Sequence, residues 1–240
     1  MALSTDYDRL YREGWCSGLE SGPTKRHQRR ILKKIVRKLA PRTILEVGCG
    51  NGIYLDFFNK LFPAAELHGI DVSSEALKLA RHKLEKAELT ICDASKNILD
   101  RVFDMVLSLD VAEHIADDQS LIDNMFRMTE KGGHLLIMTL QGRMRNFEKG
   151  IGHLRNYQQG ELAGKCVKAG YEIVKKTEWG FPFFSPLYRN FLDTGNMNAC
   201  TFGSPGFLKK WVSRFLYLLF FLNSEGRGDS IFLLARKPPV

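Results

Sequence analysis

The chain has 240 residues, of which 44% are hydrophobic and 26% charged, and it carries a formal net charge of +8. This composition is that of an ordinary globular protein, and it excludes a disordered chain or a membrane protein with many spans. A chain of this length can bury one sizeable core and carry an accessory cap, whereas two complete domains would be cramped.

The first predicted element with a strong signal is a basic helix over Thr24–Leu39. This segment holds eight basic residues and no acid, and without these eight the chain has 27 basic and 27 acidic residues. Its apolar residues recur at helical spacing, at Ile31, Leu32, Ile35, Val36 and Leu39. We therefore predict an amphipathic helix with a cationic outer face.

Short apolar runs then alternate with helical patterns from Arg42 to Leu140, which predicts a parallel sheet with helices on both faces. Strands are expected over Thr43–Val47, Glu66–Asp71, Glu88–Cys92, Phe103–Leu109 and Gly133–Leu140. Helices are expected over Gly52–Leu61, Ser74–Lys86 and Asp117–Thr129. Beyond these, the pattern adds a helix over Gln158–Ala169 and strands over Tyr171–Glu178 and Ser230–Arg236.

Between the last two strands lies an insertion, Trp179–Arg227, with 13 of the chain's 26 aromatic residues. Its first part, Trp179–Tyr188, is too rich in proline for a regular element, and we expect it to cap an acceptor pocket. The residues expected to line that pocket are Phe183, Phe184 and Tyr188. Further on, Trp211–Leu222 is an apolar helix of about 18 Å, too short for the ~30 Å hydrocarbon core of a bilayer.

The basic helix and the apolar helix together suggest peripheral contact with an anionic membrane, and hence a lipophilic acceptor. Burial of the apolar helix in the cap or in a dimer interface is the alternative. On these patterns we divide the chain into residues 1–41 (lid and basic helix), 42–178 (core), 179–227 (cap insertion) and 228–240 (final core strand).

The loop after the first strand reads Gly48-Cys49-Gly50-Asn51-Gly52. A tight strand-to-helix turn needs glycine, and the N–H groups of the next helix suit a carboxylate or a phosphate equally. Asp71 ends the next strand, where an acid can accept both hydroxyls of a ribose. The third glycine comes one residue too early for the fingerprint of NAD-binding enzymes.

Four motifs stand in order along this segment: Glu46-x-Gly48-Cys49-Gly50-x-Gly52, Gly69-Ile70-Asp71, Cys92-Asp93-Ala94 and Phe103-Asp104-Met105-Val106. Over Arg42–Leu140 they resemble the class I S-adenosylmethionine-dependent methyltransferases. Glu113-His114-Ile115 resembles the small-molecule branch, which includes the quinone-biosynthesis (type 11) methyltransferases. The resemblance implies an α/β fold with a Rossmann-like seven-stranded sheet, mostly parallel with an antiparallel last strand and flanked by helices.

The resemblance also implies which residues hold S-adenosylmethionine. These are Glu46, Gly48, Cys49, Gly50, Gly52, Asp71, Val72, Asp93, Ala94, Leu109 and Asp110. The glycine loop would hold the methionine moiety, and Asp71 and Asp93 the ribose hydroxyls and the adenine amino group. Relatives fold an N-terminal helix over the cofactor, a role open to the stripe of Tyr7, Tyr11 and Trp15, although core packing explains that stripe equally well.

Methyl transfer requires alignment of the acceptor, exclusion of water and, for some acceptors, a base that supplies about 10²–10⁴-fold. His114 follows the fourth strand, at the sheet edge where ligands bind. His153 begins a His-x-x-x-Tyr stretch that resembles one beside the substrate in many small-molecule members. We expect His153 to be the base, with Tyr157 and Arg155 orienting the acceptor. A helix cap at His114 and a surface loop at His153 are the alternatives.

Metal dependence is disfavoured because the only Asp-Asn pair, Asp123-Asn124, precedes the fifth strand, whereas magnesium-dependent relatives carry such a pair after it. The five cysteines, of which Cys16 and Cys200 lie near the ends of the chain, form no Cys-x-x-Cys pair, and no signal peptide is visible. We expect a reduced, cytoplasmic protein. Arg29 and Arg30 are candidates to reach the cofactor carboxylate, although charges that face solvent are the default interpretation.

Two other functions remain open. The basic helix and an isoelectric point near 9.3 are typical of an RNA methyltransferase, although no separate RNA-binding module is visible and DNA is not an expected partner. The third possibility is a protein that binds S-adenosylmethionine without turnover and serves as an assembly partner. The sequence favours an enzyme that methylates a small, lipophilic acceptor at oxygen or carbon.

Overall fold

The computed structural model describes residues 6–14, 22–194 and 207–239, so Trp15, Cys16 and Cys200 lie outside the described part. Its sheet has seven strands in the order β3-β2-β1-β4-β5-β7-β6. In chain order the strands are β1 Thr43–Val47, β2 Glu66–Asp71, β3 Glu88–Ile91, β4 Phe103–Leu109, β5 Thr129–Leu140, β6 Glu172–Trp179 and β7 Ser230–Arg236. Strand β7 runs antiparallel to β5 and β6, whereas the neighbouring strands among β1, β2, β3, β4 and β5 pair in parallel. The predicted fold class is confirmed.

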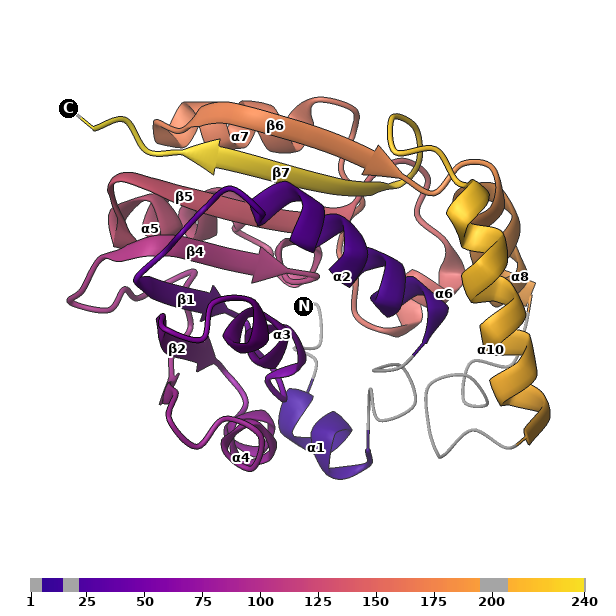
Figure 1. The fold of residues 1–240 in the computed structure, drawn as a ribbon, viewed down its shortest axis with the longest axis horizontal. Helices are drawn as coiled ribbons and strands as arrows, with labels where there is room; N and C mark the ends of the chain where they lie inside the picture. The colour runs from indigo at the N-terminus through magenta and orange to yellow at the C-terminus, as the bar shows by residue number, and fades with distance from the viewer. Residues whose placement is uncertain (1–5, 15–21, 195–206, 240) are drawn as a thin grey trace.

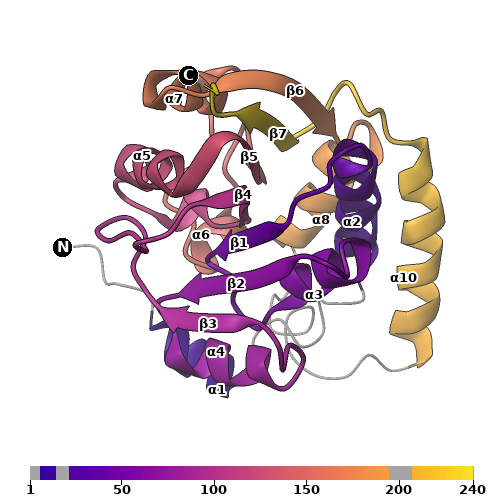
Figure 2. The ribbon, with the colours of Figure 1, turned by 60° about the vertical axis from the view of Figure 1, so that its left-hand side comes forward.

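Helices cover both faces of the sheet (Figures 1 and 2). One hydrophobic cluster joins the sheet to α2, α3, α4 and the insertion, and the other joins it to α5 and α7. The longer helices are α2 Pro23–Val36, α3 Ile53–Leu61, α4 Ser74–Arg81, α5 Asp118–Met128, α7 Glu161–Ala169 and α10 Phe207–Leu219. The shorter ones are α1 Tyr7–Arg12, η1 Ala112–His114, α6 Asn146–Gly150, η2 Phe183–Tyr188, α8 Arg189–Thr194 and η3 Phe220–Leu222.

Burial on both faces explains why the central strands read as continuous apolar runs rather than as alternating ones. In β5, Leu136 and Met138 face the first cluster, whereas Leu135 and Ile137 face the second. A register slip of one residue would exchange these two sets, so the apolar pattern fixes the pairing of β5 with its neighbours.

Most element boundaries agree with the sequence prediction to within a few residues, and two differ for visible reasons. Helix α4 ends at Arg81 rather than Lys86, because the Lys83 and Leu84 N–H groups both donate to the Ala80 carbonyl and close a turn. Strand β5 begins at Thr129 rather than Gly133, since Thr129 pairs with Phe103 ahead of an irregularity in the β4–β5 register.

The insertion is more regular than its prolines suggested. Phe183–Tyr188 forms the wide helical turn η2 with Pro186 inside it, which corrects our prediction that this stretch holds no regular element. Hydrogen bonds from the Ser185 N–H to the Gly180 carbonyl and from the Arg189 N–H to the Phe184 carbonyl close this wide turn. Pro186 has no N–H to donate, and the Phe181 carbonyl five residues before it accepts from the Ser224 N–H instead.

Part of the face that α2 turns away from the sheet lies against the insertion, so the predicted cationic outer face is exposed only in part. The Arg26 guanidinium lies 3.4 Å from the ring centre of Tyr217 in α10. Arg30 and Lys34 both pair with Glu225, at 3.1 and 2.6 Å. In both views α10 lies on the outside of the molecule beside α2 (Figures 1 and 2). None of the helices in the described residues is both long and apolar enough to span a bilayer.

Candidate active site

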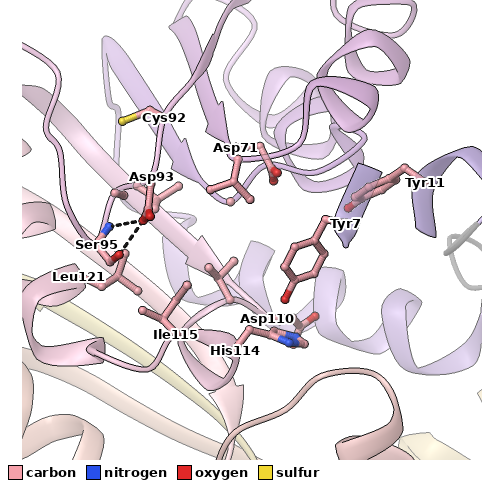
Figure 3. Close-up of a pocket in the computed structure, with 15 residues that line it drawn as sticks. Tyr7, Tyr11, Asp71, Cys92, Asp93, Ser95, Asp110, His114, Ile115 and Leu121 are labelled. Atoms are coloured by element: carbon pink, nitrogen blue, oxygen red, sulfur yellow. Dashed lines mark hydrogen bonds between the residues drawn. The ribbon is translucent and has the colours of Figure 1, made fainter. Parts of the chain in front are cut away.

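A pocket opens at the carboxyl ends of β1, β2 and β4, beneath the short helix α1 (Figure 3). The residues that line it are Tyr7, Tyr11, Val47, Gly48, Asp71, Val72, Cys92, Asp93, Ala94, Ser95, Asp110, Val111, His114, Ile115 and Leu121. Ligand sites of open α/β sheets lie at this edge, where the strand order reverses between β1 and β4. Six of the residues that the sequence predicts for the cofactor line this pocket: Gly48, Asp71, Val72, Asp93, Ala94 and Asp110.

The glycine loop after β1 has the left-handed backbone that the sequence implied. Gly48 and Gly50 have φ angles of 70° and 52°. A Cβ on Gly48 would lie 2.5 Å from a methyl of Val111, and one on Gly50 would lie 2.4 Å from the Tyr11 hydroxyl. Glycine is therefore required both by the turn and by the close approach of α1. Gly52, with φ 78°, packs on α4 instead of lining the pocket.

Asp71 connects the end of β2 to the glycine loop. Its Oδ2 accepts from the Gly50 N–H at 2.8 Å and its Oδ1 from the Ser73 N–H at 2.9 Å. Burial raises the pKa of Asp71, and these hydrogen bonds oppose the rise. The carboxylate thus has a fixed orientation at the pocket wall, with lone pairs left for hydroxyl groups of a ligand.

Asp93 and Ala94 follow β3 and form the part of the pocket suited to a flat ring. Asp93 Oδ1 accepts from the Ser95 N–H and hydroxyl, at 3.1 and 2.6 Å. Burial tends to raise the pKa of Asp93, but hydrogen bonds from Lys96 and Ser95 outweigh it and lower the pKa. The apolar side chain of Leu121 lies near this carboxylate (Figure 3), and Ala94 lines the same pocket. The arrangement offers an apolar slot with one anionic acceptor at its edge.

Asp110 lies just past β4 in a left-handed conformation with φ 58°, which is uncommon for a residue other than glycine. Its Oδ2 is 2.5 Å from Lys25 Nζ and 3.3 Å from the Tyr54 hydroxyl. Lys25 also donates to the Tyr54 hydroxyl, at 3.1 Å. The α2 cation Lys25 therefore reaches the lining residue Asp110, whereas Arg30 pairs with Glu225; none of Lys25, Arg29 and Arg30 lines the pocket itself.

Glu46, Cys49 and Leu109 are buried and do not line the pocket. Burial, with the nearby charge of Asp71, raises the pKa of Glu46 well above its usual value. Its Oε2 has no hydrogen-bond partner among the described residues. A buried acceptor of this kind is satisfied by a donor from outside the protein, and an ammonium group is chemically suited to it.

Two histidines meet at the other end of the pocket. The rings of His114 and His153 stand edge to face, with centres 4.7 Å apart, and of the two only His114 lines the pocket. His114 Nδ1 lies 3.0 Å from the Gly152 carbonyl. Burial and the neighbouring His153 lower the pKa of His114 to about 4, and burial also lowers the pKa of His153.

Glu113, which the sequence analysis named in the Glu113-His114-Ile115 motif but gave no role, lies next to this pair. It is buried, and its Oε2 accepts from the Thr139 hydroxyl at 2.8 Å. Burial and the charge of Asp110 raise the pKa of Glu113 to about 8. Glu113, His114 and His153 each offer one ligand atom within 4.8 Å of the other two, a donor set brought together by the fold from two distant segments.

The other residues predicted to touch the acceptor lie behind the pocket wall. Tyr157 is fully buried, and its hydroxyl donates to Asp118 Oδ2 at 2.8 Å. Arg155 pairs with the same carboxylate, at 2.6 Å, and donates to the Ala116 carbonyl. The aromatic residues of η2, which are Phe183, Phe184 and Tyr188, pack into the core around Trp179 and Phe220 rather than into the pocket.

Helix α1 covers the pocket and is attached to it by Asp8. The Asp8 carboxylate accepts from the Ser73 hydroxyl at 2.6 Å and from the Glu75 N–H at 3.1 Å, at the start of α4. These hydrogen bonds, led by that from Ser73, lower the pKa of Asp8. Tyr7 and Tyr11 project from α1 into the pocket, Tyr7 toward His114 (Figure 3). The predicted position of Tyr7 and Tyr11 over the cofactor site agrees with this arrangement.

The comparisons with known proteins agree with this geometry. Residues 45–137 match the family model described as methyltransferase domain. Ubiquinone biosynthesis O-methyltransferase from Nitrobacter winogradskyi is 32% identical over 117 residues, covering 47% of this chain and 44% of that protein. The protein of the same name from an Azoarcus species is 27% identical over 180 residues, covering 65% of this chain and 75% of that protein. The chain spans about half the length of several of the curated relatives it matches.

Among solved structures, the N-methyltransferase NodS from Bradyrhizobium japonicum, in complex with S-adenosyl-L-homocysteine, superposes with a TM-score of 0.63. It is 18% identical, and the superposition covers 97% of this chain and 98% of that one. This likeness shows that the two chains share a fold.

Proposed function

We propose that this chain is a class I S-adenosylmethionine-dependent methyltransferase, as the matched methyltransferase domain supports, and that it transfers a methyl group to a small, lipophilic acceptor. The observation that carries the proposal is the convergence of Asp71, Asp93 and Gly48 of the glycine loop on one pocket beneath α1. When bound, the cofactor supplies a methyl group on a positively charged sulfur, which is a good leaving group.

We assign the cofactor's parts to residues by their chemistry. Asp71 accepts the ribose hydroxyls and Asp93 the adenine amino group, with Ala94 against the ring. The ammonium group of the methionine moiety suits the buried acceptor of Glu46. Its carboxylate suits Lys25, which in the ligand-free pocket pairs with Asp110. Arg29 and Arg30, the cations first expected there, are replaced in this proposal by Lys25.

We propose that the base which takes a proton from the methyl-acceptor substrate is His114, since His114 lines the pocket. A pKa of about 4 keeps its imidazole neutral at pH 7, so that one ring nitrogen is available as a base. His153, which the sequence favoured as the base, lies in edge contact with the His114 ring and orients that ring. Tyr157 and Arg155 support the same loop through Asp118 rather than by touching the acceptor.

The lipophilic character of the acceptor is supported by two observations. Val111 and Ile115 add apolar side chains to the pocket lining around His114. Two curated relatives carry names that place them in ubiquinone biosynthesis, as O-methyltransferases. We therefore propose O-methylation of a prenylated quinone precursor, or of an acceptor of similar chemistry, as the first reaction to examine.

Calorimetric titration tests the cofactor assignment. The protein should bind S-adenosylmethionine and S-adenosylhomocysteine but not NAD, and Asp71→Ala should weaken binding by about ten-fold or more, through loss of charged hydrogen bonds. Asp100→Ala is the matched control, since Asp100 is an exposed acid just before β4. If folded protein binds neither ligand, the proposed cofactor is wrong.

Turnover is tested with methyl-labelled S-adenosylmethionine and two acceptors, a prenylated quinone precursor and total RNA. Label in the organic extract is expected, with His114→Gln losing about 10²–10⁴-fold in rate while cofactor affinity stays unchanged. His82→Gln, at an exposed position after α4, is the control. Label in RNA would instead support the RNA methyltransferase, and cofactor binding without any product would support the inactive partner protein.

A further inference from the structure

The outer face of the insertion carries a row of large apolar side chains in solvent. Phe215, Leu218 and Leu222 are 64%, 60% and 67% exposed, and Trp211, one turn before Phe215, is 58% exposed. Their spacing of four, three and four residues places them on one side of α10 and η3. We refer to these four residues as the α10 face.

The opposite side of α10 and η3 is already engaged with the protein. Tyr217 contacts His27 and Arg26 of α2, and Phe220 is fully buried against Trp179. The helix therefore has apolar residues on two sides, of which the protein covers one. Scattered apolar residues on a surface need no explanation, but a contiguous row of this size marks an interaction site.

The charges around the α10 face have one sign. Residues 207–222 contain no acid, and Arg214 of α10 is exposed. The neighbouring helix α2 also has no acid and exposes Lys33, and Arg37 and Lys38, which follow its end, are exposed as well. Glu225, the acid that lies against α2, is neutralised by Arg30 and Lys34. An occupant of this surface thus meets apolar side chains bordered by cations.

We propose that the α10 face docks on the surface of a lipid bilayer with anionic headgroups. An amphipathic helix that is too short to span a bilayer lies in the interface, with its apolar side chains at the acyl boundary and its cations among the headgroups. Tryptophan is suited to that boundary, because its ring is apolar and its N–H is polar. A second copy of this chain fits the face less well, since it would bring like charges together.

Flotation of the full chain with vesicles tests the docking. The protein should float with vesicles of phosphatidylcholine and phosphatidylglycerol, and more weakly with phosphatidylcholine alone or in high salt. Phe215→Ser combined with Leu218→Ser should weaken binding by about ten-fold or more. Val167→Ser on α7, an apolar residue 56% exposed, is the matched control and should bind as the unmodified chain does.

Absence of flotation with the anionic vesicles would overturn the proposal, and so would vesicle binding that the double substitution leaves unchanged. A dimer that dissociates in the double variant, without vesicle binding, would assign the face to a second copy and would also overturn it. Circular dichroism and titration with S-adenosylhomocysteine establish that each variant is folded. Because flotation needs neither cofactor nor turnover, its failure is distinguishable from a failure of the proposed methyl transfer.

A second measurement does not require the α10 face to tolerate serine substitutions. Trp179 is fully buried, whereas Trp211 lies on the α10 face, so lipids with a spin label near the headgroup should quench Trp211 emission. The quenched component should disappear in Trp211→Phe. If the protein floats but the quenching is absent, or if it persists in Trp211→Phe, then another surface docks and the proposal is wrong.

Discussion

Lys25 Nζ lies 2.5 Å from Asp110 Oδ2, and this ion pair joins α2 to the end of β4 across the candidate site. The two side chains are 23% and 25% exposed, so the pair is largely withdrawn from solvent. Burial opposes the charge on Lys25, but Asp110 and Tyr54 outweigh it and raise the pKa of the ammonium group well above its usual value. Asp110 therefore faces a permanent cation in the ligand-free pocket.

Replacing Lys25 by methionine should destabilise the protein by about 1–3 kcal/mol, because Asp110 is left as a partly buried charge without its cation. The same change should weaken binding of S-adenosylhomocysteine by about ten-fold or more, since the ligand carboxylate loses its proposed partner. Urea unfolding and calorimetry measure the two effects. Lys33→Met, on the exposed side of the same helix, should change neither. Unaltered ligand affinity in Lys25→Met would remove Lys25 from the proposed site.

Gly50→Ala should impair cofactor binding, because the added Cβ would lie 2.4 Å from the Tyr11 hydroxyl in a backbone region that alanine avoids. Gly164→Ala offers a contrast: nothing lies within 4 Å of its added Cβ in α7, so it should stabilise the helix by about 0.5–1 kcal/mol. Thermal unfolding with and without S-adenosylhomocysteine measures both. Full ligand-induced stabilisation of Gly50→Ala would contradict the role given to the loop.

Glu113 predicts a dependence of stability on pH. Its pKa rises from 4.5 to about 8 on folding, so the native state holds its proton where the unfolded state has released it. Its contribution is therefore fully present below pH 4.5 and is lost as the pH rises through about 8. His114 has the opposite sign, because its native pKa is about 4 whereas the unfolded imidazole still takes up protons near pH 6.5, so only a comparison with a Glu113 variant isolates the effect of Glu113.

In urea unfolding, Glu113→Gln should therefore lose less stability than the unmodified chain does as the pH rises from 6.5 to 8. Glu46, whose pKa is also raised, contributes with the same sign, so the informative quantity is the difference between the two proteins. Parallel pH profiles for the variant and the unmodified chain would mean that Glu113 is ionised in the native state.

Arg189 should be among the least replaceable residues of the insertion. Its guanidinium is 1% exposed and pairs with Glu148, which is fully buried, and with Asp229. Arg189→Met should cost about 3–5 kcal/mol, because it leaves the Glu148 carboxylate buried and unpaired. Arg101→Met, which removes a pair with exposed Glu66, should leave the urea midpoint nearly unchanged. A small loss for Arg189→Met would mean that water replaces the guanidinium.

The order of strands and helices could be predicted from the sequence, because burial on both faces of the sheet leaves an apolar run for each strand. The glycine loop and Asp71 could be predicted too, since backbone geometry restricts which residues fit a tight turn beside a ligand. Both signals are local: a strand, a turn and the first residue after a strand are neighbours in the chain.

Lys25 and Glu113 could not be identified in this way, because their environments come from distant segments. The basic helix offers eight cations with similar flanks, and only the packing of α2 beside Tyr54 and Asp110 selects Lys25. Glu113 becomes buried because it lies against Thr139 of β5. The positions of Tyr157 and Phe184 behind the wall likewise follow from packing that residue type does not reveal. The division into lid, core, cap and final strand remains a prediction.

The antiparallel direction of β7 has a consequence for the insertion as a whole. Trp179, where the chain leaves the sheet, pairs with Ser230, where the chain returns to it. Just beyond, the Phe181 N–H donates to the Arg227 carbonyl at 3.1 Å, and the two ends form a closed hairpin stem. Lengthening such a loop costs only about 0.6 kcal/mol for each doubling. The insertion is thus joined to the sheet at one closed stem, and a change of length outside the segments anchored by Phe184, Arg189 and Phe220 would leave the strand order of the core intact.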